Sequence, residues 1–298
     1  MSSRHKILDG RAVASVMYDD IARRANELAK SGFAPNLVSI SVGDTDASRL
    51  YVRNQKRTAN KLGIGFEARD YPGDIGVDEL IGVIGGLNSD PRVTGMIIQR
   101  PVPDSMPVRI LQARIHPLKD VEGMHPASIG NIVYGELTMG PCTAVAAVEL
   151  LKSTGLNLKG LEVVIIGHSE IVGKPIAFLL MNEDATVTVC HHMTRNLRVH
   201  SRQADAVFVA VGKPSLVTGD MIKPGAALID IGINQITDED GNSRIVGDVD
   251  FSSCVETAGW ITPVPGGVGP VTVGILMRNA VTAAGLIKSR YQEQFNQE

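Results

Sequence analysis

Apolar residues recur along the chain at two spacings, one helical and one strand-like. Over residues 11–30 they recur about every 3.6 residues, which predicts an amphipathic helix, and residues 48–62 resume that pattern. Short β-rich runs at 37–43 and 95–99 predict buried strands, the first ended by a glycine and the second by the prolines that follow it. Strands that alternate with helices favour crossover connections and a mostly parallel sheet.

A second series of strand patterns begins near Leu151 and includes a helical pattern at 175–181. The strand-like runs are 161–167, 186–190, 206–212 and 226–232. This repetition predicts a doubly wound fold, in which ligands bind at the carboxyl ends of the strands. We therefore predict an α/β protein with two domains, each with a mostly parallel sheet flanked by helices. Residues 1–148 plus 273–298 form the first domain, and residues 149–272 form a Rossmann-type domain.

The composition narrows the function classes. The 298 residues include 29 Lys+Arg against 32 Asp+Glu, a formal net charge of −3, and 44 % are hydrophobic. A balanced charge offers no positive field for nucleic acid or an anionic membrane, and no apolar run approaches the ~18–20 residues of a membrane span. The start of the chain lacks the apolar segment of a signal peptide. We expect a cytoplasmic protein with no nucleic-acid or membrane partner.

Three cysteines are too few and too far apart for a disulfide framework, which favours a reducing compartment. Cys142 and Cys190 are expected to be buried small apolar side chains rather than nucleophiles, and Cys254 is the third cysteine.

The loop from Gly167 to Pro175 follows a predicted strand and opens a predicted helix. Glycine lets the backbone turn tightly against a pyrophosphate, and the helix N-terminus supplies N–H donors. Ser169 stands where the G-x-G-x-x-G pattern has its middle glycine, so an ordinary strand–helix turn is the alternative. The doubly wound context favours dinucleotide binding.

A set of motifs occurs in one order along nearly the whole chain. They lie at residues 51–56, 95–103, 119–126, 141–143, 167–175, 230–234, 247–249 and 262–270. In this order they resemble the methylenetetrahydrofolate dehydrogenase/methenyltetrahydrofolate cyclohydrolase family, and PVPGGVGP at 263–270 is the most specific of them.

The resemblance implies a folate-binding, catalytic first domain, an NAD(P)-binding second domain with the folate cleft between them, and a homodimer. The family's catalytic tyrosine and assisting glutamine correspond to Tyr51 and Gln99. Its catalytic lysine position holds Gln55, and its pterin-binding aspartate position holds Glu122. The catalytic set is therefore Tyr51, Gln55 and Gln99, and the implied substrate-binding residues are Tyr51, Gln99, Glu122, Pro265, Gly266 and Gly267.

Gln55 is the departure with the largest chemical consequence. Residues at i and i+4 share a helix face, so position 55 faces the cleft with Tyr51, while Lys56 lies about 100° further round the helix. Hydrolysis of the methenyl carbon needs a group that exchanges protons, which an amide does not provide, whereas hydride transfer needs mainly positioning. We expect a methylenetetrahydrofolate dehydrogenase with impaired or absent cyclohydrolase activity.

Two alternatives remain. One is the ordinary bifunctional enzyme, with Lys56 or another cation supporting hydrolysis. The other is a catalytically inactive folate- or nucleotide-binding homologue. Glu122 keeps the carboxylate with one more methylene, and we interpret it as a compensated exchange; Ala144 and Ala146, where the family usually has proline and glycine, are interpreted as structural drift.

The residues after the second nucleotide-domain strand predict NADP rather than NAD. An NAD site usually offers an acid there, but residues 190–195 contain no acid and offer His191, His192 and Arg195, with His168 in the preceding loop. Adjacent strand residues point to opposite faces, and no third ligand has suitable spacing, so we predict no metal site. The predicted cofactor-binding residues are Gly167, His168, Ser169, Ile171, Val172, His192, Arg195, Gly212, Ile233 and Thr272.

Overall fold

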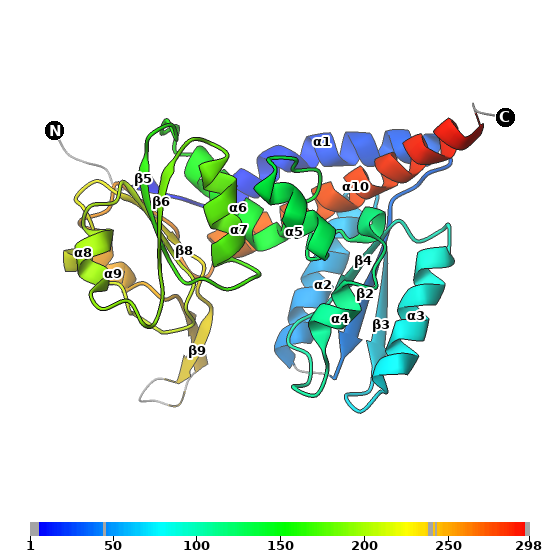
Figure 1. Ribbon diagram of the computed structural model, residues 1–298, viewed down its shortest axis with the longest axis horizontal. Coiled ribbons are helices and arrows are strands. Elements are labelled where there is room, and N and C mark those ends of the chain that lie inside the picture. Colours follow the sequence, from blue (N-terminus) through cyan, green and yellow to red (C-terminus); the bar gives the residue numbers. More distant parts are fainter. Residues whose placement is uncertain (1–5, 44–45, 238–240, 242, 296–298) are drawn as a thin grey trace. The chain divides into compact units, whose positions relative to one another are not determined.

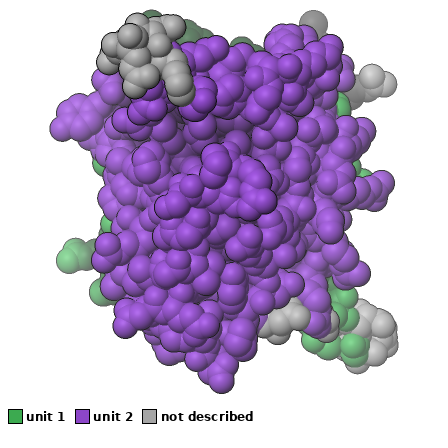
Figure 2. All heavy atoms as spheres, turned by 90° about the vertical axis from the view of Figure 1, so that its right-hand side faces the viewer, with its two compact units in different colours: residues 1–16, 141–272 green, residues 17–140, 273–298 purple. Residues whose placement is uncertain are grey.

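The chain divides into two compact units (Figure 2). The computed structural model describes all residues except 1–5, 44–45, 238–240, 242 and 296–298. Unit 1 comprises residues 1–16 and 141–272, and unit 2 comprises residues 17–140 and 273–298. The predicted α/β class, with parallel sheets flanked by helices, is confirmed.

Unit 2 contains a three-stranded parallel sheet in the order β3-β2-β4. Its strands are β2 (Asn36–Val42), β3 (Gly65–Tyr71) and β4 (Gly95–Ile98). Apolar residues of β2 and β4, among them Ile40 and Ile98, pack against Leu80 and Ile84 of one helix and Leu111 of another. The helices of this unit are α2 (Asp46–Lys61), α3 (Val77–Ser89), α4 (Val108–Gln112) and α5 (Pro126–Val133), with a 3-10 turn at Pro117–Lys119.

Two long helices, α1 (Gly10–Lys30) and α10 (Val268–Phe295), lie side by side along unit 2 (Figure 1), where Arg24 donates to the Thr282 hydroxyl. The window 268–294 of α10 is long and apolar enough to span a membrane, which the sequence analysis did not find. However, 67 % of its most apolar window is buried inside the structure, as expected of a core helix.

Unit 1 contains a six-stranded parallel sheet in the order β1-β11-β8-β7-β5-β6. Its strands are β1 (Lys6–Ile7), β5 (Glu162–Ile166), β6 (Thr186–Cys190), β7 (Ala206–Val209), β8 (Ala227–Asp230) and β11 (Trp260–Ile261). Its helices are α6 (Cys142–Lys152), α7 (Gly173–Met181), α8 (Leu197–Ser201) and α9 (Phe251–Cys254), with a 3-10 turn at Gly219–Met221. An antiparallel pair, β9 (Asn234–Thr237) and β10 (Ser243–Val246), extends from this unit and was not predicted.

The division of the chain differs from the predicted one at two segments. Residues 1–16 group with unit 1 because β1 pairs with β11 in the six-stranded sheet. Residues 141–148 group there because α6 packs against α7 and β8. All three cysteines are buried and free, as expected for Cys142 and Cys190.

Candidate active site

Gln55 and Gln99 form a buried pair of amides in unit 2. Gln55 comes from α2 and has no solvent exposure, and Gln99 directly follows β4. The Gln99 Nε2 donates to Gln55 Oε1 at 2.8 Å and to the Ser39 hydroxyl of β2 at 2.9 Å. In return, Gln55 Nε2 lies 3.5 Å from Gln99 Oε1. The helix face and the strand end named by the sequence analysis therefore meet in a neutral network, the Ser39–Gln55–Gln99 network.

Tyr51 lies one turn before Gln55 on α2, and its side chain is 37 % exposed. Lys56, the next residue after Gln55, has an exposed side chain, while Gln55 is buried. The helical geometry therefore separates the nearest lysine from the Ser39–Gln55–Gln99 network, as the expected rotation about the helix axis requires.

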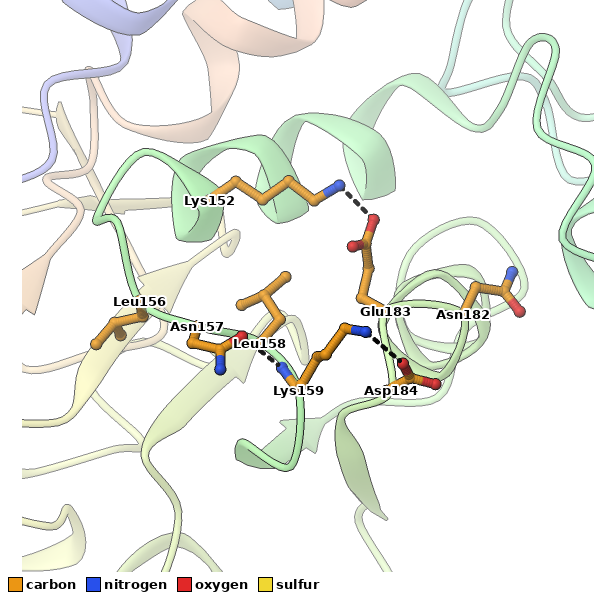
Figure 3. A pocket seen from close by; sticks show the side chains of 8 residues that line it. All are labelled: Lys152, Leu156, Asn157, Leu158, Lys159, Asn182, Glu183 and Asp184. Atoms are coloured by element: carbon orange, nitrogen blue, oxygen red, sulfur yellow. Dashed lines mark hydrogen bonds and ion pairs between the residues drawn. The ribbon is translucent and has the colours of Figure 1, made fainter.

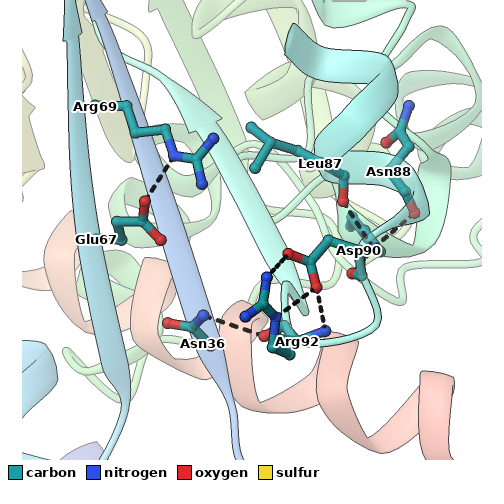
Figure 4. A network of polar contacts seen from close by, with 8 residues as sticks. Asn36, Glu67, Arg69, Leu87, Asn88, Asp90 and Arg92 are labelled. Carbon is teal, nitrogen blue, oxygen red and sulfur yellow. Dashed lines mark hydrogen bonds and ion pairs between the residues drawn. The ribbon is translucent and has the colours of Figure 1, made fainter.

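Lys119 is buried and is held at the end of α3. Its ammonium donates to the carbonyl oxygens of Leu87 (3.0 Å), Asn88 (2.8 Å) and Asp90 (2.8 Å). Figure 4 shows Leu87, Asn88 and Asp90 at this helix end. Burial lowers the pKa of Lys119. A cation that satisfies the last carbonyls of a helix has a structural role, so Lys119 is not placed to serve as a proton-transfer group.

The turn after Lys119 is fixed by Asp120. Its buried carboxylate accepts from the backbone N–H groups of Gly123 (3.1 Å), Met124 (3.2 Å) and His125 (2.7 Å), and from the Ser128 hydroxyl (2.8 Å). These four bonds hold the turn that presents the neighbouring carboxylate, Glu122.

Glu122 belongs to a second polar network, which we call the Arg100–Gln112–Glu122 network. The Arg100 Nη2 donates to Gln112 Oε1 at 3.3 Å, and Gln112 Nε2 donates to Glu122 Oε2 at 3.4 Å. Burial, followed by the charge of Asp120, raises the pKa of Glu122 to about 7, although Arg100 and Gln112 act in the opposite direction. A carboxyl group with such a pKa can exchange protons at neutral pH.

Sequence reasoning missed Arg100 and Gln112. Gln112 is buried at the end of the short, mostly apolar α4, and Arg100 follows Gln99 directly. A polar residue in a mostly apolar helix and a charged residue shortly after a buried strand end were the sequence features that could have indicated these two residues. Among the residues that the structure describes, Arg100 Nε is a buried side-chain nitrogen without a hydrogen-bond partner.

In unit 1, the glycine loop after β5 is sterically obligatory. Gly167 has φ +120°, and a Cβ there would lie 2.2 Å from the Ala210 carbonyl oxygen. A Cβ on Gly173, where α7 begins, would lie 2.0 Å from the Gly167 carbonyl oxygen. Ser169, Ile171 and Val172 occupy the turn between these glycines, ahead of the amino end of α7. A loop of this shape brings backbone close to a bound phosphate.

Three imidazoles gather at the carboxyl ends of β5 and β6. One ring nitrogen from each histidine, His168, His191 and His192, lies within 4.8 Å of a ring nitrogen of each of the other two. The His168 and His191 rings pack edge-on with centroids 4.8 Å apart. Exposed Arg195 lies on the same turn after β6.

These histidines are not arranged as strand alternation predicted when no metal site was expected. Strand β6 ends at Cys190, so His191 and His192 lie in a turn where strand alternation does not apply. The third imidazole comes from the loop after β5 rather than from nearby sequence. His191 was also absent from the predicted cofactor-binding residues; its Nδ1 accepts from the Met193 N–H at 3.2 Å.

The remaining predicted cofactor residues differ in their surroundings. Gly212, with φ +67°, donates its N–H to Asp248 Oδ2 at 2.9 Å after β7. Ile233 is 71 % exposed beyond β8. Thr272 is buried within α10, and its hydroxyl donates to the Val268 carbonyl oxygen at 3.1 Å.

Two buried aspartates organise this edge of the sheet. Asp230 accepts from the N–H groups of Gly232, Asp248 and Val249 (each 3.0 Å), and burial raises its pKa to about 6. Asp248 in turn accepts from Asn234 Nδ2 at 2.8 Å. Both aspartates therefore serve the loops themselves.

The predicted Pro265, Gly266 and Gly267 form a tight loop before α10. Gly266 has φ +116°, and its carbonyl oxygen accepts from the Gly10 N–H at 2.9 Å. The Gly267 N–H donates to the Pro263 carbonyl oxygen at 2.8 Å. The loop is thus fixed against the start of α1 by backbone contacts.

A polar hollow in unit 1 lies away from these residues (Figure 3). It is lined by residues between α6 and β5 and between α7 and β6, at the amino ends of those strands. Its lysines are paired, Lys152 with Glu183 and Lys159 with Asp184 (3.6 Å). Ligands of doubly wound folds bind at the opposite, carboxyl ends, so this hollow is not a candidate site.

Models of two domains of one protein family match this chain. Residues 141–288 match the tetrahydrofolate dehydrogenase/cyclohydrolase NAD(P)-binding domain, and residues 8–122 match the catalytic domain of the same name. The chain is 62 % identical over 285 residues to "Bifunctional protein FolD 2" of Mesorhizobium japonicum, covering 96 % of this chain and 92 % of that protein.

Solved structures agree. The bifunctional FolD enzyme of Campylobacter jejuni has a TM-score of 0.89 at 38 % identity, covering 94 % of this chain and 99 % of that one. The Trypanosoma brucei methylenetetrahydrofolate dehydrogenase-cyclohydrolase, complexed with NADP cofactor and inhibitor, has a TM-score of 0.89 at 36 % identity, covering 94 % and 97 %. The resemblance predicted from the motifs is confirmed, and the chain belongs to the tetrahydrofolate dehydrogenase/cyclohydrolase family.

Proposed function

We propose that this protein oxidises 5,10-methylenetetrahydrofolate to 5,10-methenyltetrahydrofolate with NADP, and that its cyclohydrolase activity is impaired or absent. Family membership and the NAD(P)-binding domain support the dehydrogenase activity. The buried amide pair of Gln55 and Gln99 supports the second part. The resemblance puts a catalytic lysine where Gln55 stands.

The two reactions make different demands on this network. Oxidation removes a hydride from the methylene carbon and leaves a cation shared by the two flanking nitrogens. It requires positioning and an environment that tolerates positive charge, and the neutral Ser39–Gln55–Gln99 network adds no opposing cation. Hydrolysis adds water to the methenyl carbon, removes a proton from that water and protonates the departing nitrogen. A side-chain amide has no accessible proton equilibrium for these transfers.

The residues of unit 1 fit NADP. A Cβ at Gly167 or Gly173 would clash with neighbouring carbonyl oxygens, so only glycine allows the tight loop ahead of α7. The three imidazoles and Arg195 offer hydrogen-bond donors for a 2′-phosphate, and residues 190–195 contain no acid. We assign Gly167, Ser169, Ile171 and Val172 to the pyrophosphate side, and His168, His192 and Arg195 to the 2′-phosphate. When bound, NADP supplies the hydride acceptor.

The ordinary bifunctional activity is the second candidate, because the Mesorhizobium relative is named bifunctional and Glu122 has a pKa of about 7. The pKa of Glu122 lies near neutrality, so this carboxyl group could exchange protons with water. Neither Lys56, which is exposed, nor Lys119, which caps α3, supports this candidate.

One assay separates these activities. Purified protein is given methylenetetrahydrofolate and NADP⁺, and NADPH and methenyltetrahydrofolate are followed together. We expect NADPH and methenyltetrahydrofolate to rise in equal amounts, and added methenyltetrahydrofolate to decay at the buffer rate. Decay well above the buffer rate supports the bifunctional candidate, and absence of NADPH formation supports an inactive homologue.

We further propose a cytoplasmic homodimer that associates through unit 1, which follows from the family resemblance, with small-molecule ligands and no nucleic-acid or membrane partner. Light scattering coupled to size-exclusion chromatography measures the mass directly. A monomer at micromolar concentration would contradict the dimer without affecting the reaction assignment.

A further inference from the structure

Arg100 is a cation with an unused donor beside the candidate folate site. It directly follows Gln99, its side chain is partly buried, and its Nη2 is engaged with Gln112. Its Nε is buried and has no hydrogen-bond partner among the described residues. Buried donors are nearly always paired in folded proteins, so an unpaired one beside a ligand site points to an acceptor that the ligand supplies.

Glu122 provides acceptors at the other end of the same network. Glu122 is a half-buried residue, and its carboxylate receives one long hydrogen bond, from Gln112 at 3.4 Å on Oε2. Ionised carboxylates have about four lone-pair sites, so this contact leaves acceptor capacity.

Gln112 fixes how the two charged groups are arranged. It is buried, only 3 % exposed, and its amide accepts from Arg100 and donates to Glu122. The Gln112 amide lies between the Arg100 guanidinium and the Glu122 carboxylate. The two charged groups are therefore linked through the amide, and neither fully neutralises the other. The network thus presents a donor and a pair of acceptors in a fixed order.

That order matches one edge of a 2-amino-4-oxopteridine ring. Such a ring presents the 4-oxo acceptor, then the N3–H donor, then the 2-amino donor. A guanidinium N–H pairs with the oxo group, and the two carboxylate oxygens pair with the two donors. A 4-aminopteridine places a second amino group where the oxo acceptor was, against the guanidinium.

We propose that Arg100 is a specificity-determining residue that selects 4-oxo over 4-amino pteridines, and that Gln112 is its positioning residue. This inference rests on the proposed function, because it assumes that the site binds a folate. It adds a cationic donor to the pterin site that the family resemblance did not assign.

The test compares competitive inhibition constants of folic acid (4-oxo) and aminopterin (4-amino) against methylenetetrahydrofolate. The wild-type protein is expected to prefer folic acid by about tenfold or more, the size of one hydrogen bond to a charged group. Arg100→Met is expected to reduce this preference to within about threefold, and Gln112→Leu to reduce it partly. Arg114→Met, which removes an exposed arginine of the same unit, keeps the wild-type preference.

Arg100→Lys keeps the charge but not the planar fork, and provides a second variant if the methionine variant does not fold. It is expected to lose most of the preference, because a compact ammonium does not reproduce the in-plane donors of the guanidinium. An unchanged preference in a folded Arg100 variant overturns the inference while the proposed function stands. A wild-type protein that neither oxidises methylenetetrahydrofolate nor binds folic acid overturns both.

Discussion

The two proposed ligand-binding regions, for the nucleotide in unit 1 and for the folate in unit 2, are built in different ways. The nucleotide region of unit 1 depends on backbone, because Gly167 and Gly173 leave no room for a Cβ beside neighbouring carbonyls. The folate region of unit 2 depends on side chains, joined in the Ser39–Gln55–Gln99 and Arg100–Gln112–Glu122 networks. Steric contacts define the region of unit 1, whereas hydrogen-bond donors, acceptors and charges define the region of unit 2.

The difference shows where chemistry can change without loss of the fold. A side chain at a glycine position of the nucleotide loop meets main chain, which cannot move without disturbing the sheet. A glutamine at position 55 instead pairs with one residue, Gln99, through both the oxygen and the nitrogen of its amide. We infer that side chains of unit 2 determine the reaction specificity of this protein, whereas steric contacts with the main chain determine the shape of the glycine loop in unit 1.

Gln55→Lys is expected to have the largest effect, because one side chain of unit 2 should change which reaction the protein catalyses. The new ammonium would lie where Gln99 Oε1 can accept from it. Burial and a cationic substrate would lower its pKa towards neutrality. General acid–base catalysis contributes ~10²–10⁴-fold, so methenyltetrahydrofolate hydrolysis should rise by that order, with modestly slower NADP reduction. Hydrolysis is measured as loss of methenyltetrahydrofolate absorbance.

Lys56→Gln is the matched control for that variant, since it removes an adjacent exposed lysine and should leave both rates unchanged. If Gln55→Lys folds and binds folate but gains no hydrolysis, a single residue does not explain the activity. Arg100 and Glu122 would then be the first residues to examine, because they place other charges in the same unit.

His192→Asp tests the proposed 2′-phosphate position in unit 1. It places a negative charge beside the proposed 2′-phosphate position while the glycine loop stays intact. The KM for NADP should rise roughly 10–100-fold, and the KM for NAD should change less than about threefold. His200→Asp, at an exposed histidine in α8, is the control. Equal changes for both cofactors would place the phosphate elsewhere.

Lys119→Met tests whether the buried lysine near the folate region is structural. The variant leaves the carbonyl oxygens of Leu87, Asn88 and Asp90 without their shared cation, which should cost about 2–3 kcal/mol of unfolding free energy. Chemical denaturation measures this loss. Lys30→Met, at the exposed end of α1, should cost at most about 0.5 kcal/mol. Similar losses in both variants would contradict the capping role.

The nucleotide loop was predictable from sequence because its steric constraint appears directly as glycine. The Gln55–Gln99 pair was also within reach, since helical spacing and a strand end placed both on one side. The parallel strands followed from their apolar runs, but the β9–β10 pair, largely exposed, gave no comparable pattern.

Contacts that depend on distant elements were not predictable. The Arg100–Gln112–Glu122 network requires α4 to place Gln112 between a strand end and a turn, which no local pattern encodes. The histidine cluster was missed because strand alternation was extended beyond Cys190, where the strand ends.

The smallest expected effect is the pH dependence of stability from Glu122. Its pKa in the folded protein, about 7, is above the usual value of 4.5, so the folded state keeps a proton that the unfolded state releases between those pH values. Stability should therefore fall as pH rises from about 4.5 to about 7 and change little from this group above that range. With partial exposure and screening taken into account, the loss is on the order of 1 kcal/mol.

Glu122→Gln removes this dependence, because an amide of nearly the same shape does not titrate. The difference in unfolding free energy between variant and wild type should shift towards the variant by about 1 kcal/mol between pH 5 and pH 8, measured by urea denaturation. Glu136→Gln, at an exposed position of the same unit, should show no such shift. A constant difference between Glu122→Gln and wild type would mean that the carboxylate stays ionised throughout. Its contacts with Arg100 and Gln112 would then outweigh burial, and Glu122 could not serve as the neutral-pH base of the bifunctional candidate.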